Sequence, residues 1–293
     1  MAGWQGKSKG TTLGYRIFVF VLRKFGVLPA YFMLRFVALY YIIFSPATTR
    51  NIYRYFQSGL GYGSLKSIVS TYNNYYLFGQ AIIDKVVIMS DFPNKFTFHF
   101  DGEENLKEIV AQNRGGLLLS SHIGNWEIAG HLLNRLETRI NLVMFDAEHE
   151  QIREYLSSVT GGRNLNVILI KDDLSHIYEI NDAFLKNELI CMHSDRYIKG
   201  NRTITAEFLG SPAKFPAGPF VLASTFRVPV SYVYAMKETK YHYHFSASRA
   251  IAYVGQNRDT VMKNMLADYV TEMERKVKAY PEQWYNYYNF WQN

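Results

Sequence analysis

Short apolar runs alternate with amphipathic segments between residues 115 and 193, and this alternation restricts the fold more than any other feature of the sequence. Apolar runs with the length of buried strands lie at residues 117–119, 140–145, 165–170 and 189–193. Segments with helical length and spacing lie at residues 126–136, 148–159 and 174–185. Strands that alternate with helices form a mostly parallel sheet with helices on both faces. The sequence therefore predicts an α/β fold with a mostly parallel central sheet flanked by helices.

The rest of the chain adds elements of both kinds. Further helices are predicted at residues 46–90 with a break at 59–63, and at 103–112, 218–226 and 256–280. Further strands are predicted at 228–236 and 241–245, together with one that ends at residue 100. The aromatic segment 280–291 is expected either to pack against the core or to lie in a membrane interface.

A histidine follows the apolar run 117–119 directly after two serines. Ligands of open α/β sheets bind beyond the carboxyl ends of the strands, so His122 is expected in such a crevice. Glu127 falls in the first turn of the next helix, with Asn125 as its N-cap. The Glu127 carboxylate can then orient one ring nitrogen of His122 while the other takes a proton from a substrate hydroxyl. The alternative is a structural histidine, which is the commoner role for a single histidine beside a strand.

Two charged residues, Asp195 and Arg196, follow the strand 189–193 and are expected at the same edge of the sheet as His122. They could position an anion or acyl donor, or form a structural ion pair at the strand end. Arg196 suits a phosphate or an oxyanion. Arg114, which precedes the central strand, and the backbone N–H groups near Gly124 are further candidates for binding an oxyanion.

A loop punctuated by glycine and proline spans residues 210–219 and leads into the helix that begins at Gly218. The N-terminus of that helix can hold an anion, and Lys214 adds a positive charge. The alternative is a tight loop with no binding role. On the strand 241–245, His242 and His244 share one face and could bind zinc, but no third ligand stands at an informative spacing. We therefore expect a solvated strand face and no metal.

Residues 15–44 are strongly apolar, interrupted by Arg23, Lys24 and Arg35. The uninterrupted part is shorter than the roughly 20 apolar residues of a spanning helix, and no signal-peptide cleavage site follows it. The segment is either a membrane anchor or a helical pair that covers the core of a soluble protein. The mixture of aromatic and basic residues favours the anchor. We predict an anchor over residues 1–45 and a single further domain over residues 46–293.

The charge of the chain, with 32 basic and 25 acidic residues and a net charge of +7, suits an anionic partner. A lipid headgroup or an acidic carrier protein fits better than nucleic acid, because the basic residues are dispersed and no nucleic-acid-binding module is present. Cys191 is the single cysteine, so the chain forms no internal disulfide, which suits a reducing compartment. The sequence contains neither the GxSxG motif of serine hydrolases nor a Walker A loop.

Three sequence blocks carry a resemblance to a known family. The segment His-Ile-Gly-Asn-Trp-Glu at residues 122–127 resembles the H-x4-D/E motif of the lysophospholipid acyltransferase superfamily. Its HxGNWE form is similar to that of the late, lauroyl or myristoyl, acyltransferases of lipid A biosynthesis. The segment 208–223 and the Pro-Glu-Gln-Trp segment at residues 281–284 are similar to two further blocks of that family. The three blocks span about residues 115–291.

This resemblance implies a membrane-bound O-acyltransferase with a hydrophobic N-terminal anchor and no cofactor. The enzyme would move a fatty acyl group from acyl carrier protein or coenzyme A to a hydroxyl of a lipid A-type glycolipid. It would act at the cytoplasmic face of the bacterial inner membrane. His122 would be the general base and Glu127 its orienting acid. Asp195, Lys214 and Gly218 would line the substrate site, although the family often has Gln where this chain has Arg196.

Two alternatives stay open at this point. The enzyme could acylate a different acceptor, such as a lysophospholipid, a glycosylated lipid, an amino-acid lipid or a pigment. The chain could also be a catalytically silent, membrane-bound protein that binds a lipid or a carrier. The presence of both His122 and Glu127 counts against a silent protein.

Overall fold

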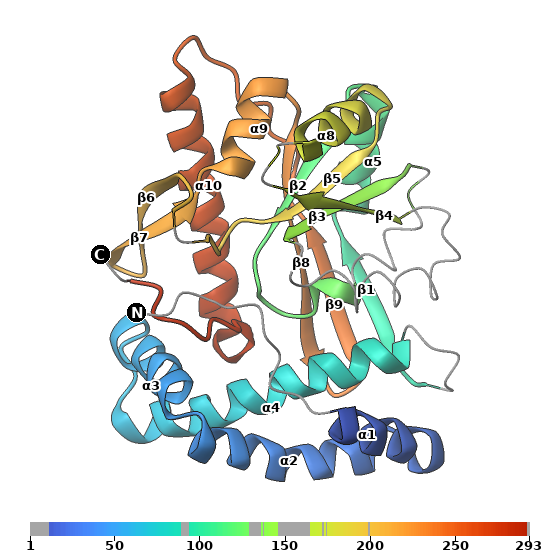
Figure 1. Ribbon diagram of the computed structural model, residues 1–293, viewed down its shortest axis with the longest axis vertical. Helices are drawn as coiled ribbons and strands as arrows, with labels where there is room; N and C mark the ends of the chain where they lie inside the picture. Colours follow the sequence, from blue (N-terminus) through green and yellow to red (C-terminus); the bar gives the residue numbers. More distant parts are fainter. Residues whose placement is uncertain are drawn as a thin grey trace. The chain divides into compact units, whose positions relative to one another are not determined.

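The computed structural model describes residues 12–88, 94–128, 136, 138–145, 165–171, 173, 175–198 and 200–291 (Figure 1). The chain divides into two compact units. The helical unit consists of Met1–Phe96, Glu207–Ala213 and Glu274–Asn293, and the sheet unit consists of Thr97–Ala206 and Lys214–Met273. The functional boundary predicted at residue 45 stays a prediction, because compactness does not report which residues enter a membrane.

The sheet unit is built on a seven-stranded sheet with the order β1-β9-β8-β2-β5-β3-β4. Its strands are β1 (Thr97–Asp101), β2 (Gly116–Ser120), β3 (Ile140–Phe145), β4 (Leu165–Ile170), β5 (Leu189–His193), β8 (Val230–Thr239) and β9 (His242–Ala247). Every neighbouring pair is parallel except β8 and β9, which are antiparallel. The mostly parallel sheet predicted from the sequence is therefore confirmed. All five residues of β2 are buried, as its continuous apolar run predicts.

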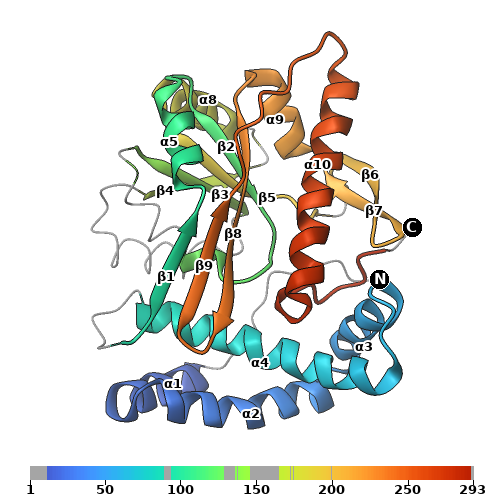
Figure 2. The same ribbon diagram turned by 180° about the vertical axis from the view of Figure 1, so that it is seen from behind.

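Helices cover both faces of this sheet, and α5 and α8 lie on opposite faces in the two views (Figures 1 and 2). Among the described residues, the helices with given bounds in this unit are α5 (Glu103–Ala111), α8 (Ser175–Leu185), α9 (Gly218–Phe226) and the N-terminal part of α10 (Arg258–Ala279). One core cluster joins Leu106 and Ile109 of α5 to Leu118 of β2 and Leu189 of β5. The helix predicted at residues 148–159 lies outside the described residues.

A two-stranded hairpin of β6 (Thr203–Phe208) and β7 (Ser211–Pro216) was not predicted. Residues 210–219 were expected to form a loop leading into a helix. The helix α9 does begin at Gly218, but β7 occupies most of the segment before it. Leu209 and Gly210 connect the two strands with φ angles of 51° and 75°. A two-residue connection with both φ angles positive is the favoured hairpin turn.

The helical unit contains α1 (Thr12–Phe25), α2 (Val27–Phe44), α3 (Pro46–Arg54), a π-helical turn (Tyr55–Gly59) and α4 (Ser64–Ile88). The predicted helical region with a break near residues 59–63 is confirmed. The face of α2 with Ala30, Leu34 and Ala38 is buried, and the Tyr31 hydroxyl donates a hydrogen bond to the carboxylate of Asp84 in α4. A Cβ added at Gly79 of α4 would lie 2.4 Å from a methyl group of Leu34, so these two helices are closely packed.

The outer face of α2 is apolar and exposed. By length and composition α2 could cross a membrane, although a core helix of a soluble protein would pass the same test. Core helices are mostly buried, whereas only 28% of α2 is buried, which favours an interaction outside the protein. The exposed apolar residues on α2 are Leu28, Phe32, Phe36, Leu39, Tyr40, Ile43 and Phe44.

The C-terminal aromatic segment packs within the helical unit. Trp284 is almost fully buried, with its ring edge-on to Tyr55 at 4.9 Å and to Phe208 at 5.3 Å between ring centroids. The side-chain amide of Asn74 donates hydrogen bonds to the carbonyl oxygens of Glu282 and Trp284, at 3.0 and 2.9 Å. The segment 280–291 therefore packs against the core, which is one of the two roles that the sequence analysis left open.

Candidate active site

The pairing of β2 with β5 places the end of one strand beside the end of the other. Ser120 and His193 are register partners, and the Ser194 N–H donates to the Ser120 carbonyl oxygen at 3.0 Å. Two residues further along each strand, His122 Nδ1 lies 2.7 Å from Asp195 Oδ1. The backbone N–H of His122 also donates to Asp195 Oδ2 at 3.0 Å. One carboxylate therefore holds both the ring and the backbone of this histidine. The sequence analysis expected Asp195 and His122 at the same edge of the sheet, and the structure brings them together.

The turn after His122 is fixed to β8. Gly124 forms an isolated bridge with Ala235, and the Asn125 N–H donates to the Ala235 carbonyl oxygen at 2.8 Å. Gly124 has a φ of +71°, and a Cβ there would lie 2.1 Å from that carbonyl oxygen. Only glycine combines this left-handed backbone with so close an approach. The backbone geometry therefore explains why the HxGNWE motif has glycine at this position.

Asp195 is ionised at neutral pH. Burial by itself raises its pKa, but the adjacent His122 and its hydrogen bond, with Arg196 and His193, hold the pKa of Asp195 well below its ordinary value. A buried carboxylate facing Nδ1 favours the His122 tautomer with the proton on Nδ1. Among the described residues the ring makes no other hydrogen bond, and 15% of the side chain is exposed. Nε2 is therefore positioned to accept a proton from a bound molecule.

The carboxylate that bonds the His122 ring in this structure is that of Asp195, whereas the sequence analysis assigned the orienting role to Glu127. Glu127 is half-buried in a helical segment that begins at Trp126, beyond the turn at Gly124. The register explains this contact, since Asp195 lies two residues beyond the end of β5 just as His122 lies two residues beyond the end of β2. Asn125 directly precedes the helical segment as expected, and its amide nitrogen is 3.4 Å from the Tyr243 hydroxyl. A catalytic role for Glu127 stays a prediction.

The structure adds His193, which the sequence analysis counted only as the last residue of a strand. Its ring centroid lies 4.5 Å from that of His122 and 4.6 Å from that of Trp126. Its Nδ1 is buried and has no hydrogen-bond partner among the described residues. Burial, with the nearby His122, holds the pKa of His193 well below its ordinary value. His193 is therefore a neutral wall of the site.

Tyr269 of α10 is a second residue that the sequence analysis missed. Its buried hydroxyl donates to the Ser120 carbonyl oxygen at 3.1 Å and shares a hydrogen bond with Ser121 Oγ at 2.7 Å. Phe215 of β7 and Phe220 of α9 pack edge-on against its ring, with centroids 6.0 and 5.8 Å away. Tyr269 thus links the 210–219 region to the strand end that carries His122. Its place on the apolar face of a helix gave no signal of this contact.

Of the remaining predicted site residues, only Arg196 is adjacent to the His122–Asp195 pair in the described structure. Arg196 is half-buried directly after Asp195. Lys214 lies in β7 and Gly218 begins α9, and the described structure shows no contact of either with the His122–Asp195 pair. Arg114 is exposed at the amino end of β2 and bonds the Gln112 side chain, at 3.1 and 2.8 Å. The five residues of β2 lie between Arg114 and the carboxyl end of the strand, and a substrate-binding role for Arg114 stays a prediction.

The site also contains possible metal ligands and lies near the single cysteine, Cys191. His122, His193 and Asp195 each offer a ligand atom within 4.8 Å of one another, so they could hold a metal ion. Without a metal, the same group consists of the hydrogen-bonded pair of His122 and Asp195 with the ring of His193 packed beside that of His122. Burial raises the pKa of the Cys191 thiol to about 12, so this cysteine stays protonated and is a poor nucleophile.

Of three comparisons with known proteins, of sequence family, curated sequences and solved structures, the family comparison agrees with the sequence blocks. A search of curated proteins finds no match. Among solved structures, the chain is similar to the 1-acyl-sn-glycerophosphate (LPA) acyltransferase PlsC from Thermotoga maritima, with 15% identity and a TM-score of 0.40. That similarity covers 87% of this chain and 98% of the other, but at this score it decides nothing about the reaction. The sequence profile of the bacterial lipid A biosynthesis acyltransferases matches residues 63–293. This protein is an acyltransferase, and it belongs to the bacterial lipid A biosynthesis acyltransferase family.

Proposed function

We propose that this acyltransferase moves a fatty acyl group from a thioester donor to a hydroxyl of a lipid A-type glycolipid, with His122 as general base. The observation that carries the mechanism is the 2.7 Å contact between His122 Nδ1 and Asp195 Oδ1. It orients the ring and leaves Nε2 for the substrate. The family match supports the choice of acceptor.

The reaction needs no covalent acyl-enzyme. The acceptor hydroxyl gives its proton to His122 Nε2 as its oxygen attacks the thioester carbonyl. Asp195 stabilises the imidazolium that forms. The tetrahedral intermediate then collapses to the ester, and the departing sulfur takes the proton from the imidazolium and leaves as a thiol.

Charge on the carbonyl oxygen has to be stabilised during this step. The Gly124 N–H and the Arg196 guanidinium are the donors we favour, because the Ile123 and Asn125 N–H groups already bond the carbonyl oxygens of Ser121 and Ala235. Glu127 lies in the first helical turn after this loop, and it would help to stabilise the imidazolium that His122 forms.

The donor and the location follow from charge and from the helical unit. Acyl carrier protein is the donor we favour over coenzyme A, because the chain carries a net charge of +7 and that carrier is acidic. The exposed apolar face of α2 would insert into the cytoplasmic face of the bacterial inner membrane. Arg23, Lys24 and Arg35 would meet anionic headgroups.

Mass spectrometry of whole lipid extracts, from cells with and without this gene, tests the proposal. The extract with the gene should contain a glycolipid that is heavier by one fatty acyl group in ester linkage. The same cells carrying the His122→Ala protein should lack it, because loss of a general base costs about 10²–10⁴-fold in rate. Acylated product at the normal level with His122→Ala would overturn the base assignment, and a change confined to another lipid class would overturn the acceptor.

A further inference from the structure

The strand β1 forms one edge of the sheet and β4 forms the other. At the β1 edge, β1 and β9 together present a polar face. The two strands are parallel, with His99 opposite His244 and Thr97 opposite His242. Alternate residues point to opposite faces of a strand, so His99 and Asp101 share one face of β1 while the phenylalanines Phe98 and Phe100 point to the other. Pairing of these strands therefore brings His99 and Asp101 beside His244, which lies 143 residues after Asp101 in the sequence.

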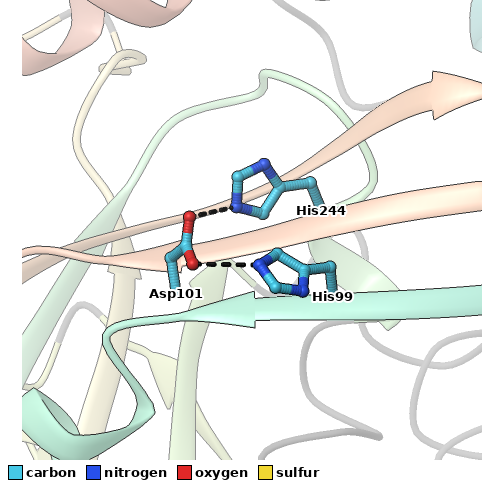
Figure 3. A group of neighbouring side chains, drawn as sticks. All are labelled: His99, Asp101 and His244. Carbon is cyan, nitrogen blue, oxygen red and sulfur yellow. Dashed lines mark hydrogen bonds and ion pairs between the residues drawn. The ribbon is translucent and has the colours of Figure 1, made fainter.

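The three side chains converge on one point (Figure 3). Asp101 Oδ2 lies 2.7 Å from His244 Nε2, and Asp101 Oδ1 lies 3.1 Å from His99 Nε2. One ligand atom from each residue lies within 4.8 Å of the other two. The side chains of His99 and Asp101 are 62% and 60% exposed, so a hydrated ion can reach them. Two imidazoles and one carboxylate are a donor set of catalytic zinc sites, which leave a further position open to water.

Glu238 of β8 supplies an independent observation. Its Oε1 lies 3.0 Å from His244 Nδ1, the ring nitrogen on the far side from Asp101. Histidines that bind metals almost always donate their other N–H to a carboxylate or carbonyl, which fixes the ring and raises its basicity. With Nδ1–H bonded to Glu238, the Nε2 lone pair of His244 would face Asp101 and be open to a metal ion.

We propose that His99, Asp101 and His244 bind one Zn²⁺ ion, with Glu238 as the carboxylate that orients His244. The site is separate from the His122 crevice and takes no part in the acyl transfer proposed above. Its consequence is structural, because the ion would cross-link β1, the edge strand, to β9. Binding to the folded chain alone would raise its stability by mass action. The sequence analysis found no third ligand at an informative spacing from His242 and His244; Asp101 escaped notice because it lies 143 residues from His244 along the chain.

Zinc titration of the purified full-length protein in detergent tests this site. Isothermal titration and competition with a chromogenic chelator should show one Zn²⁺ bound by His99, Asp101 and His244. Each of His99→Ala, Asp101→Ala and His244→Ala should lose that ion, and also the rise in melting temperature that zinc gives the wild type. Glu238→Gln should weaken binding about 10–100-fold, the usual effect of losing such a partner. Mg²⁺ and Ca²⁺, which prefer oxygen ligands, should not displace zinc at equal concentration.

Two control variants separate this site from other places where zinc could bind. Asp182→Ala removes a carboxylate with the same 60% exposure, which is paired with Lys186 on α8, and should bind zinc like the wild type. His122→Ala should keep the ion, and would lose only a second ion held by His122, His193 and Asp195. The proposal is overturned if the wild type takes up no zinc, if the three ligand variants bind it normally, or if His122→Ala removes the only ion bound.

Discussion

His122 and Asp195 are joined twice, through the ring Nδ1 at 2.7 Å and through the backbone N–H of His122 at 3.0 Å. Both contacts end on one buried carboxylate, one oxygen for each. The side chain and the backbone of His122 are thereby fixed to the end of β5, so the ring cannot rotate without breaking a charge-assisted hydrogen bond. This arrangement makes the orientation of the ring depend on Asp195.

Replacing Asp195 by Asn should lower kcat by about 10²–10⁴-fold with a smaller effect on KM, because the amide can no longer hold the reactive tautomer of His122. The double variant His122→Ala, Asp195→Asn should be little worse than His122→Ala alone, since residues that act as a unit are not additive. Steady-state rates of the purified variants with an acyl thioester donor provide the measurement.

Glu127→Gln is the matched variant for this experiment, because it makes the same change at the acid that the sequence favoured. If Asp195 alone orients His122, the Glu127→Gln enzyme should keep a normal pH dependence of kcat even where its rate is reduced. A near-normal rate for Asp195→Asn beside an inactive Glu127→Gln would return the orienting role to Glu127.

Gly124→Ala should destabilise the sheet unit and abolish activity. The backbone at Gly124 is left-handed, which costs a residue with a Cβ about 1–3 kcal/mol, and the added Cβ would lie 2.1 Å from the Ala235 carbonyl oxygen. Gly63→Ala is the control, since a Cβ there meets no atom within 4 Å and the backbone is not left-handed. Melting temperatures of the two variants should differ by several degrees. Equal melting temperatures would mean that the turn relaxes freely.

Acidification should destabilise the protein through His193. Burial holds its folded-state pKa well below 6.5, so the unfolded chain takes up a proton below about pH 6.5 that the folded chain does not. The unfolded state then binds more protons, and the free energy of unfolding falls as the pH falls, by up to ~1.4 kcal/mol per pH unit. His193→Gln should reduce this slope between pH 7.5 and 5.5. The slope should not vanish, because burial also lowers the pKa of His176.

Asp195 does not contribute in that pH window. Its folded-state pKa is lowered, so the stability that it provides is lost only as the pH falls below the ordinary aspartate value of about 3.9. Identical slopes for the wild type and His193→Gln between pH 7.5 and 5.5 would show that His193 takes up its proton at the same pH in the folded and unfolded chains, and would contradict the lowered pKa.

Substitution of Phe32, Phe36 and Ile43 by Ser should move the protein from the membrane fraction towards the soluble fraction. These side chains are exposed on α2 and make up much of its apolar face. The control replaces Tyr178 and Leu185 of α8 by Ser, which are also exposed and apolar but belong to the sheet unit. Fractionation and vesicle flotation measure the partition. An unchanged partition of the α2 variant would remove the anchor role from this face.

Local patterns in the sequence predict the elements of the sheet well. The bounds predicted for residues 140–145, 165–170 and 189–193 are those of β3, β4 and β5, because a continuous apolar run is itself the signature of a buried parallel strand. The hairpin β6–β7 escaped prediction because its turn depends on a positive φ at Leu209, a residue type that rarely adopts one.

Contacts between distant strands are less visible in the sequence. The rule that ligands gather at strand ends brings Asp195 near His122, but the choice between Asp195 and Glu127 depends on the register of β2 against β5. Likewise, no spacing within β9 reveals that His99 and Asp101 lie beside His244. That neighbourhood follows from the parallel pairing of β1 with β9, which only the folded chain displays.

The salt dependence of the rate should separate a carrier-protein donor from coenzyme A. The net charge of +7 can recruit an acidic carrier protein through exposed lysines and arginines, and such attraction is screened over about 8 Å at physiological ionic strength. We therefore expect the rate with acyl carrier protein to fall steeply between low and physiological salt, mainly through a rising KM. Acyl-coenzyme A is small and would bind within the crevice, where screening is weaker, so its rate should fall less. The acceptor has to be presented in a neutral detergent, so that headgroup charge stays constant. Equal salt dependence for the two donors would assign the basic surface to the membrane and remove the case for a carrier protein.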